Sequence, residues 1–416
     1  MSYLNVIEKL DLIERDNPFD ELRVDAFIDH IKSNKNKVLV LFCSYQNLVD
    51  PFRQCIDFLC KEFDIYIIYT RTVQEFSNDY LVKKTVTINR NFNALKKILK
   101  ECNNIDTFVI TNMGLIWNWY YLYVRHYTFA KIIVYARDFI STFHCQCFDT
   151  LIEVNGSKEK ALLEFEANEQ IISSADGILT SFSGKGFDTI KKQNPNTYFF
   201  LPVLSKTIYK NVRFHNVPKK FSFVYAGSMY PTKYIKKFDQ ISVKLGIFKD
   251  ILVSNKTYSL HAFPEPVFPF HEFGCYNSLG SKFTLHKSLP VQTLIEKIVH
   301  FDFGLCIQDF RLIDSSIIDA HKYLFPTKIF TYLAAGLPVI INDEYGIAKD
   351  FIVKNRLGIA VKSSEFINLN QILKRYDYNM LKNNVVKFQK QYYLEKEKNN
   401  LLTFIDNIVD KKKEVL

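Results

Sequence analysis

The stretch Phe325-Pro-Thr-Lys-Ile-Phe-Thr-Tyr-Leu-Ala-Ala-Gly-Leu-Pro-Val-Ile-Ile341 indicates the fold class of this chain. It predicts a short helix that begins at Pro326 and ends at Gly336, because proline suits a first helical turn and glycine adopts the left-handed conformation that ends a helix. The apolar run at 339–341 is typical of a buried strand in a parallel sheet. Strand–loop–helix units of this kind point backbone N–H groups at phosphate.

The composition is that of a globular protein with two or three domains. The chain has 416 residues, of which 48% are hydrophobic and 24% are charged. The net charge of +10 suits nucleic acid, anionic lipid or an anionic substrate. Because the lysines are spread along the chain and no nucleic-acid-binding module is present, we expect no nucleic-acid partner and at most a weak attraction to anionic membrane.

The amino-terminal residues argue against a secretory signal. Glu8, Asp11 and Glu14 stand where a signal peptide needs an apolar core. No apolar run reaches the roughly 18 residues of a membrane span. We therefore expect a cytoplasmic protein that associates at most peripherally with the inner face of the cell membrane.

The cysteines do not predict a metal site. Cys145 and Cys147 form a C-x-C pair beside His144, whereas zinc sites more often combine C-x2-C with a second pair, which is lacking here.

Two series of alternating strands and helices predict two Rossmann-like domains. Buried strands at 37–42, 64–69, 107–111 and 131–135 form the first series, and 221–228 opens the second. We expect a helical amino-terminal extension at 1–35, a Rossmann-like acceptor domain at 36–205, a linker at 206–220, a Rossmann-like nucleotide-sugar domain at 221–378, and carboxyl-terminal helices at 379–416. A region rich in proline and glycine, 264–280, is predicted to be a loop insertion.

The residues 326–340, P-x-K-x-x-x-Y-L-A-A-G-L-P-V-I, resemble the donor-nucleotide segment of GT-B glycosyltransferases. The closest resemblance is to glycosyltransferase family 4 and its bacterial cell-surface polysaccharide relatives. Residues 175–181, 221–228 and 302–307 are similar to further segments of that family. The resemblance implies a GT-B fold, in which two Rossmann-like domains face a cleft and a carboxyl-terminal helix returns to the first domain.

The resemblance also implies an activity. It suggests a hexosyltransferase that moves a hexose from a nucleotide sugar to a polysaccharide or lipid-linked glycan, with retention at the anomeric carbon. GT-B enzymes need no D-x-D metal motif and the chain has none, so we expect no metal and no other cofactor.

Cationic side chains and helix amino termini would then hold the donor diphosphate. Lys328 lies in the first turn of the predicted helix, Gly227 and Ser228 end a predicted strand, and Lys233 follows one turn later. Each also has a purely structural interpretation, as an exposed lysine or a strand-end turn. The expected donor-binding residues are Gly227, Ser228, Lys233, Tyr323, Pro326, Thr327, Lys328, Thr331 and Gly336.

The chain departs from the family at its paired glutamates, which fall on Tyr323 and Thr331. The second glutamate of the family usually accepts hydrogen bonds from ribose hydroxyls, and a threonine can accept such a bond but carries no charge. Either Asp314 or Asp319 substitutes, or donor recognition has diverged, or activity is lost.

In the first domain, Arg137 and Asp138 follow a predicted strand, where open α/β sheets bind ligands. We assign them as candidate catalytic residues: Arg137 for phosphate, and Asp138 for orienting or deprotonating the acceptor. They could instead form a structural ion pair. The loop at 44–47 is a further candidate for donor or acceptor contact.

Two other functions remain open at this point. One is a catalytically silent GT-B-like protein that binds glycan or a partner protein, which the missing glutamates favour. The other is a GT-B-like sugar-nucleotide epimerase, which needs a dense set of carboxylates and histidines that the sequence does not reveal.

Overall fold

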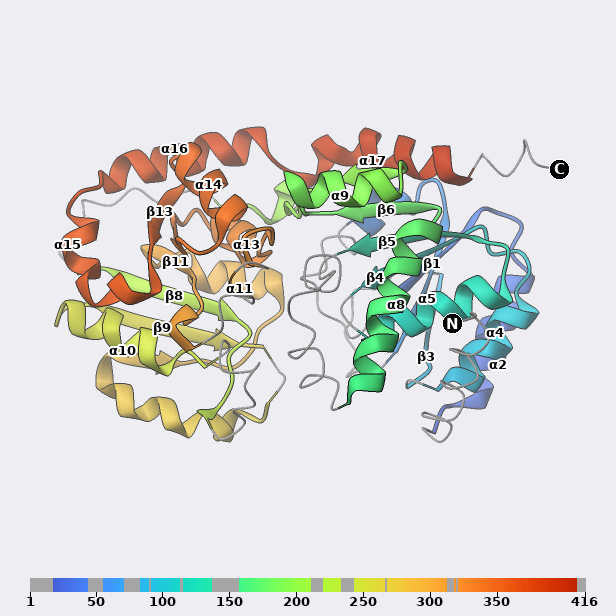
Figure 1. The fold of residues 1–416 in the computed structure, drawn as a ribbon, viewed down its shortest axis with the longest axis horizontal. Helices are drawn as coiled ribbons and strands as arrows, with labels where there is room; N and C mark the ends of the chain where they lie inside the picture. The colour runs from blue at the N-terminus through green and yellow to red at the C-terminus, as the bar shows by residue number, and fades with distance from the viewer. Residues whose placement is uncertain are drawn as a thin grey trace. The chain divides into compact units, whose positions relative to one another are not determined.

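The computed structural model describes residues 18–43, 55–70, 83–89, 91–112, 115–136, 157–210, 220–232, 243–265, 268–312, 318 and 321–409 (Figure 1). The chain forms two compact units, Met1–Leu201 with Glu397–Leu416 and Pro202–Lys396. Each unit contains a parallel sheet, which confirms the prediction of an α/β protein with two Rossmann-like domains.

The described part of the first unit contains a seven-stranded sheet in the order β3-β2-β1-β4-β5-β6-β7. Its strands are β1 (Val38–Cys43), β2 (Asp64–Tyr69), β3 (Lys84–Thr87), β4 (Thr107–Asn112), β5 (Lys131–Ala136), β6 (Gly177–Thr180) and β7 (Thr197–Phe199). The helices are α2 (Glu21–Lys32), α3 (Ile56–Leu59), α4 (Phe92–Glu101), α5 (Leu115–Tyr127), α8 (Lys158–Ser174) and α9 (Lys185–Gln193). The strand order reverses between β1 and β4.

Helix α2 comes from the region that the sequence predicts to be an amino-terminal extension. It is part of the first unit's core, because its apolar face is buried against α4 and β3. The ring of Phe27 meets that of Tyr66 edge-on at 5.6 Å. The remainder of the predicted extension, 1–17, lies outside the described residues.

The carboxyl-terminal helix α17 (Leu394–Val409) packs against β6 and β7 of the first unit. Gly177 in β6 permits a close approach, because an added Cβ there would lie 2.1 Å from Cδ1 of Ile408. Tyr198 in β7 donates a hydrogen bond of 2.8 Å to Glu397, and its ring lies 5.4 Å from that of Phe404.

The described part of the second unit contains a six-stranded sheet in the order β10-β9-β8-β11-β12-β13. Its strands are β8 (Ser222–Gly227), β9 (Ser259–Pro264), β10 (Phe283–Leu285), β11 (Phe303–Cys306), β12 (Val339–Asn342) and β13 (Gly358–Val361). The helices are α10 (Leu245–Ser254), α11 (Val291–Ile298), α13 (Lys328–Ala334), α14 (Gly346–Lys354), α15 (Leu369–Leu373) and α16 (Tyr378–Gln391). All four residues of β12 are buried, as predicted for this run.

The predicted loop insertion at 264–280 is largely helical. Residues Phe270–Lys282 form a 3₁₀ segment that is kinked at Gly280. Phe273 and Tyr276 are buried, so the segment gains apolar burial that the density of proline and glycine in the sequence did not suggest.

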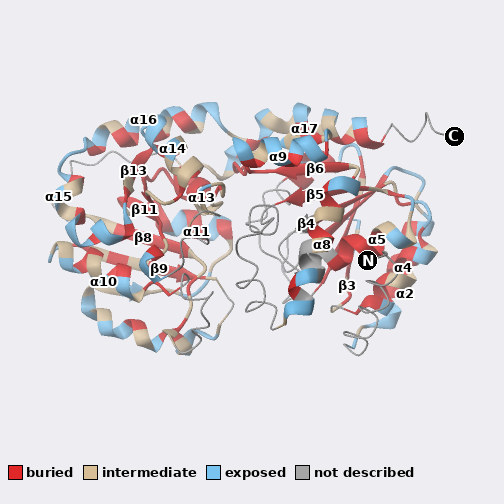
Figure 2. Ribbon diagram, viewed as in Figure 1, coloured by how far each residue is buried: buried red, intermediate tan, exposed pale blue. Residues whose placement is uncertain are grey.

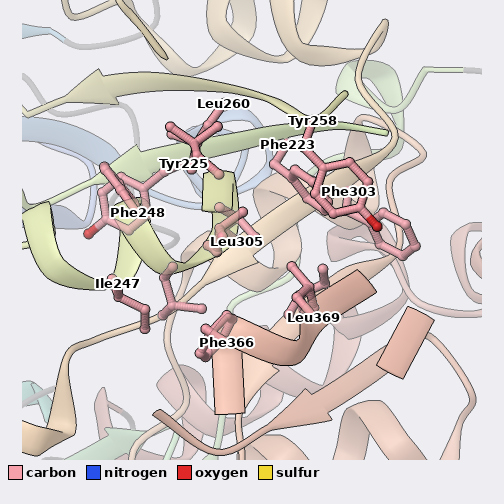
Figure 3. Close-up of a cluster of buried hydrophobic side chains, with 14 of the residues drawn as sticks. Phe223, Tyr225, Ile247, Phe248, Tyr258, Leu260, Phe303, Leu305, Phe366 and Leu369 are labelled. Atoms are coloured by element: carbon pink, nitrogen blue, oxygen red, sulfur yellow. The ribbon is translucent and has the colours of Figure 1, made fainter. Parts of the chain in front are cut away.

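Aromatic side chains form much of the second unit's core (Figure 3). The ring of Phe223 lies 5.0 Å from that of Tyr258, and the ring of Tyr225 lies 5.5 Å from that of Phe248. In both units the strands are buried, whereas the helices are exposed on their outer faces (Figure 2).

The first residues of the predicted linker at 206–220 are bound to the second unit. The amide of Lys210 donates to the carbonyl of Ala334 at 2.8 Å, and the hydroxyl of Tyr209 donates to the carbonyl of Tyr392 at 2.8 Å. Residues 211–219 of that linker lie outside the described residues.

Candidate functional site

The strand order of the second sheet reverses between β8 and β11. β9 and β10 lie on one side of β8, and β11, β12 and β13 lie on the other. The paired register joins Phe223 to Phe303 and Val224 to Gly304, before either strand reaches its carboxyl end. Ligands of open α/β sheets bind at such reversals, beyond the carboxyl ends of the strands.

Tyr332 of α13 occupies the space where β8 and β11 separate. Its hydroxyl accepts a hydrogen bond of 2.8 Å from the amide of Ala226 and donates one of 2.9 Å to the carbonyl of Leu305. Gly304 leaves room for the ring, since a Cβ there would lie 2.1 Å from Cγ of Tyr332. A fully buried side chain therefore fixes α13 to the reversal point.

Helix α13 begins at Lys328, and the prediction of a start at Pro326 is wrong by two residues. The amide of Ile329 donates to the carbonyl of Pro326, and that of Phe330 to the carbonyl of Thr327. These bonds span three residues, so the chain enters the helix through a tighter turn.

The carboxyl end of α13 is as predicted. Gly336 has a φ of +78°, and its amide donates to the carbonyl of Leu333 at 3.0 Å. The amide of Leu337 donates to the carbonyl of Tyr332 at 2.9 Å. This pair of bonds is the Schellman arrangement, which ends a helix and turns the chain into β12.

Lys328 holds its ammonium group at the carboxyl end of β8. Its Nζ donates to the hydroxyl of Tyr225 at 3.2 Å and lies 4.6 Å from the centre of that ring. Gly227 has a φ of +138°, and a Cβ on it would lie 3.0 Å from the same Nζ. The hydroxyl of Tyr225 donates to the carbonyl of Ser228. The structure thus brings Gly227, Ser228 and Lys328 together around one tyrosine.

A second lysine, Lys244, approaches the same ring from the residue before α10. Its Nζ lies 5.9 Å from the ring centre of Tyr225 and donates to Oε1 of Gln308. The side chain is fully buried. Burial lowers the pKa of Lys244 well below its usual range, and the positive charge of Lys328 lowers it further.

Polar groups that follow β11, β12 and β13 form a connected network beside this pair. The amide of Gln308 donates to Asn342 at 2.6 Å, and Asn342 donates to the hydroxyl of Ser363 at 2.9 Å. Glu344 accepts a hydrogen bond of 3.0 Å from the amide of Ser363. The other carboxylate oxygen of Glu344 is buried and has no hydrogen-bond partner among the described residues.

Helix α16 holds the carboxyl end of α13. Lys382, which is 2% exposed, donates its Nζ to the carbonyl of Gly336 at 3.1 Å. Gln389 donates to the carbonyl of Leu333 at 2.8 Å. Burial lowers the pKa of Lys382 to about 8, and the carboxylate of Asp302 opposes this shift. A cation at this end of a helix complements the helix dipole.

The other predicted donor-binding residues do not lie around Tyr225 as Gly227, Ser228 and Lys328 do. Thr331 is buried in α13, Tyr323 is partly exposed before it, and Pro326 and Thr327 form the entering turn. Gly336 lies at the opposite end of α13 from Lys328, where it ends the helix and its carbonyl accepts a hydrogen bond from Lys382. Several predicted residues lie outside the described residues: 44–47, Arg137, Asp138, His144, Cys145, Cys147, Lys233, Asp314 and Asp319.

Sequence reasoning missed Tyr225, Lys244, Gln308 and Lys382. Lys244 did carry a signal, because apolar Val243 and Leu245 flank it at the start of a mostly apolar helix. Nothing local marks Lys382, whose burial depends on the packing of α16 against α13.

The described part of the chain contains neither a metal-binding cluster nor a membrane-spanning helix. No group of three or more His, Cys, Asp or Glu side chains is placed to hold a metal ion. No helix among these residues has the length and apolar character to cross a membrane.

The second unit resembles a known protein family. Residues 256–395 match the model of the glucosyltransferase 3-like, C-terminal domain. This match covers about a third of the chain and lies within the second unit. The matched segment contains Lys328, Thr331 and Glu344, whereas Gly227 and Lys244 precede it. No curated protein matches the chain in sequence.

Solved structures align with most of the chain and show that it has a GT-B fold. Sucrose-phosphate synthase from Thermosynechococcus elongatus aligns with a TM-score of 0.56 at 10% identity, over 90% of this chain and 100% of the other. Phytolacca americana UGT2, in complex with UDP-2fluoro-glucose and pterostilbene, aligns with a TM-score of 0.53 at 11% identity, over 91% and 100%. The UDP co-structure of S. aureus MnaA aligns with a TM-score of 0.52 at 10% identity, over 90% and 97%. These identities are too low to carry over an activity.

Proposed function

We propose that the protein is a hexosyltransferase that moves a hexose from a nucleotide sugar to a polysaccharide or lipid-linked glycan. The observation that carries the proposal is the position of the Lys328 ammonium group over Gly227, at the point where the strand order of the second sheet reverses. The glucosyltransferase 3-like match and the GT-B fold support it.

The proposed reaction needs negative charge to be stabilised on the departing nucleoside diphosphate. Lys328 supplies a cation that is fixed in place by Tyr225, and such preorganised charge is usually the largest catalytic contribution. Gly227 has no side chain, so its backbone permits a close approach, which the proposal assigns to a phosphate. Transfer on this arrangement would need no metal ion.

The proposed site also needs an acceptor for the hydroxyls of the donor. Thr331, at the position of a family glutamate, is buried and carries no charge. Glu344, which the sequence did not suggest, is a further candidate, because one of its carboxylate oxygens has no hydrogen-bond partner among the described residues. We propose that this oxygen accepts a hydrogen bond from a ribose or sugar hydroxyl.

For the acceptor, the proposal keeps Arg137 and Asp138, which follow the carboxyl end of β5. Strand β5 lies beside β4 on one side of the order reversal in the first sheet. Retention at the anomeric carbon, cytoplasmic location and peripheral attachment to anionic membrane are further parts of the proposal. The net charge of +10 supports the last of these.

The test measures donor binding and turnover in wild type and in Lys328→Ala. Isothermal titration with UDP, GDP, CDP and ADP identifies the preferred diphosphate. We expect Lys328→Ala to weaken its binding by about 1.5–3 kcal/mol, the scale of a hydrogen bond to a charged group. The matched control is Lys354→Ala, which removes an exposed lysine at the end of α14 and should bind as wild type does.

Turnover separates the proposal from its main alternative. Free nucleoside diphosphate should appear when the enzyme is mixed with the matching nucleotide hexose and a glycan extract. Binding without any turnover would favour the catalytically silent protein suggested by the missing glutamates at Tyr323 and Thr331. Unchanged affinity in folded Lys328→Ala would remove α13 from the donor site.

A further inference from the structure

The turn between α5 and β5 holds an aromatic side chain out in solvent. Phe129 is 96% exposed, which makes it the most exposed large hydrophobic side chain among the described residues. The amide of Thr128 donates to the carbonyl of Val124 at 3.1 Å, and the amide of Ala130 donates to the hydroxyl of Thr128 at 3.0 Å. Ala130 itself is buried. The residues on both sides of Phe129 are therefore fixed, and the backbone holds the ring away from the core.

Two lysines of α4 lie beside this turn. The Nζ atoms of Lys96 and Lys100 lie 5.4 Å and 5.6 Å from the ring centre of Tyr127, which precedes Phe129 by two residues. The two lysines are one helical turn apart, so they lie on the same face of α4. Tyr127 thus gathers two positive charges next to the exposed ring of Phe129.

The surface around this turn carries an excess of positive charge. The turn lies where β1, β4 and β5 begin, because the carboxylate of Asp106 accepts from the amide of Val38 at 2.8 Å and its carbonyl accepts from the amide of Lys131 at 2.9 Å. The ionisable side chains at this edge are the cations Lys32, Lys35, Lys37, Lys96, Lys100, Arg125 and Lys131, and the carboxylates Asp29, Glu101, Asp106 and Asp176. The cations outnumber the carboxylates by three.

Ion pairs within this set do not remove the excess. Lys32 bonds Glu101 at 2.7 Å. Asp176 accepts from Arg125 at 2.7 Å and from Lys131 at 3.3 Å. None of these side chains is fully buried, and ion pairs near the surface contribute little energy. The cations can therefore also face an anionic surface outside the protein.

An aromatic ring with cations around it fits an anionic lipid surface. Phenylalanine rings bind at the boundary between headgroups and acyl chains, and lysines face the anionic headgroups beside them. A nucleic-acid backbone attracts the lysines but offers no apolar layer to the ring. A single exposed apolar side chain is ordinary on a protein surface, so the combination of Phe129 with the lysines of α4 carries the inference.

We propose that Phe129, Tyr127, Lys96 and Lys100 form a docking surface for an anionic phospholipid bilayer. The ring of Phe129 enters the headgroup region, and the two lysines face anionic headgroups. The inference rests on one part of the proposed function, the peripheral attachment to anionic membrane, and assigns that attachment to a surface. One ring and a few charges give weak and reversible attachment, because stable anchoring needs stronger signals.

The experiment measures binding of the full-length protein to sedimented vesicles. One set of vesicles contains phosphatidylcholine with phosphatidylglycerol, and the other contains phosphatidylcholine alone. We expect binding to the anionic vesicles, and binding about tenfold or more weakly to the neutral ones, which offer no negative charge. Raising the salt concentration from about 0.1 M to about 0.5 M should weaken binding to the anionic vesicles, because the Debye length shortens.

Variants of the docking surface separate its apolar and charged parts. Phe129→Ser should bind anionic vesicles about tenfold more weakly, because the apolar ring no longer leaves water. The double variant Lys96→Gln, Lys100→Gln should bind about 25-fold more weakly, since each lysine near an anionic surface contributes about fivefold.

Two matched controls should bind the vesicles as wild type does. Leu22→Ser removes a side chain that is 82% exposed, but it lies on α2 beside Asp20 and Glu21. The double variant Lys354→Gln, Lys374→Gln removes the same charge from exposed positions of the second unit.

The outcomes separate this inference from the donor site. Equal binding of Phe129→Ser and wild type, or of anionic and neutral vesicles, overturns the inference. If Phe129→Ser dissociates an oligomer in sedimentation velocity and leaves vesicle binding unchanged, the surface contacts a second copy of the chain and the inference is wrong. Phe129→Ser should bind the preferred nucleoside diphosphate as wild type does. Wild type that binds diphosphate but no vesicles therefore overturns the docking surface and leaves the donor site in place.

Discussion

Replacing Tyr332 with phenylalanine tests whether this side chain fixes α13 to the strand reversal. The change removes one hydroxyl, which accepts from the amide of Ala226 and donates to the carbonyl of Leu305. Both backbone groups lie where β8 and β11 are no longer paired, and Tyr332 is fully buried. The variant therefore leaves a buried donor and a buried acceptor without this partner.

Each buried polar group that loses its hydrogen bond costs about 1–3 kcal/mol. For two such groups we expect Tyr332→Phe to lower the free energy of unfolding of the second unit by about 2–6 kcal/mol. The ring itself stays, so no cavity contributes to this number. Because Lys328 lies four residues earlier on the same short helix, diphosphate affinity should fall as well.

The assay is native-state hydrogen exchange, followed by mass spectrometry of peptides from each unit. Amides of β8 and β11 should exchange faster in Tyr332→Phe, while peptides from the first unit keep their protection. Trp117 and Trp119 lie in α5 of the first unit, so their fluorescence during urea unfolding gives an independent control. Tyr376→Phe is the matched variant, since Tyr376 is 42% exposed and should change stability by less than about 0.5 kcal/mol. A loss below that limit in Tyr332→Phe would refute the idea that its hydroxyl anchors α13.

Three further predictions concern the same unit. Lys382 has a pKa of about 8 in the fold against 10.5 when unfolded, so the unfolded chain binds more protons between these values. The free energy of unfolding should therefore rise with pH in that window, by up to about 3 kcal/mol. Urea unfolding of wild type and of Lys382→Met at pH 7.5 and 9.5 measures this rise, which the variant should lack. Gly227→Ala should lower the free energy of unfolding by about 1–3 kcal/mol, because alanine is strained at a φ of +138°. The same change should weaken diphosphate binding, because the added methyl group displaces the Lys328 ammonium group. Unchanged binding curves in isothermal titration would show that the site tolerates a side chain at this position. Transfer activity should persist in EDTA, and loss in EDTA with recovery in manganese would contradict the proposed metal-independent reaction.

Much of the fold could be predicted because strongly apolar runs have few alternatives to burial. β2 (Asp64–Tyr69) occurs at the predicted residues, and β12 extends one residue beyond its prediction. The strands that sequence reasoning did not name, such as β3 (Lys84–Thr87) and β7 (Thr197–Phe199), are short, mix polar with apolar residues and lie at sheet edges. Whether such a segment forms a strand depends on the strand beside it in the sheet, and the local sequence does not identify that neighbour.

The sequence by itself determined the α/β class, the end of α13 at Gly336 and the presence of Lys328 in its first turn. These features depend on local chemistry: apolar periodicity, the left-handed conformation of glycine and a lysine at a fixed offset from both. The tertiary structure alone decided that Lys244 and Lys328 share the ring of Tyr225, and that Lys382 closes the far end of α13. Lys328 is far along the chain from Tyr225 and Lys244, and the strand order of the sheet brings it to the same edge. Burial, which shifts the pKa of Lys244 and Lys382, is a property of that packing and not of any sequence window.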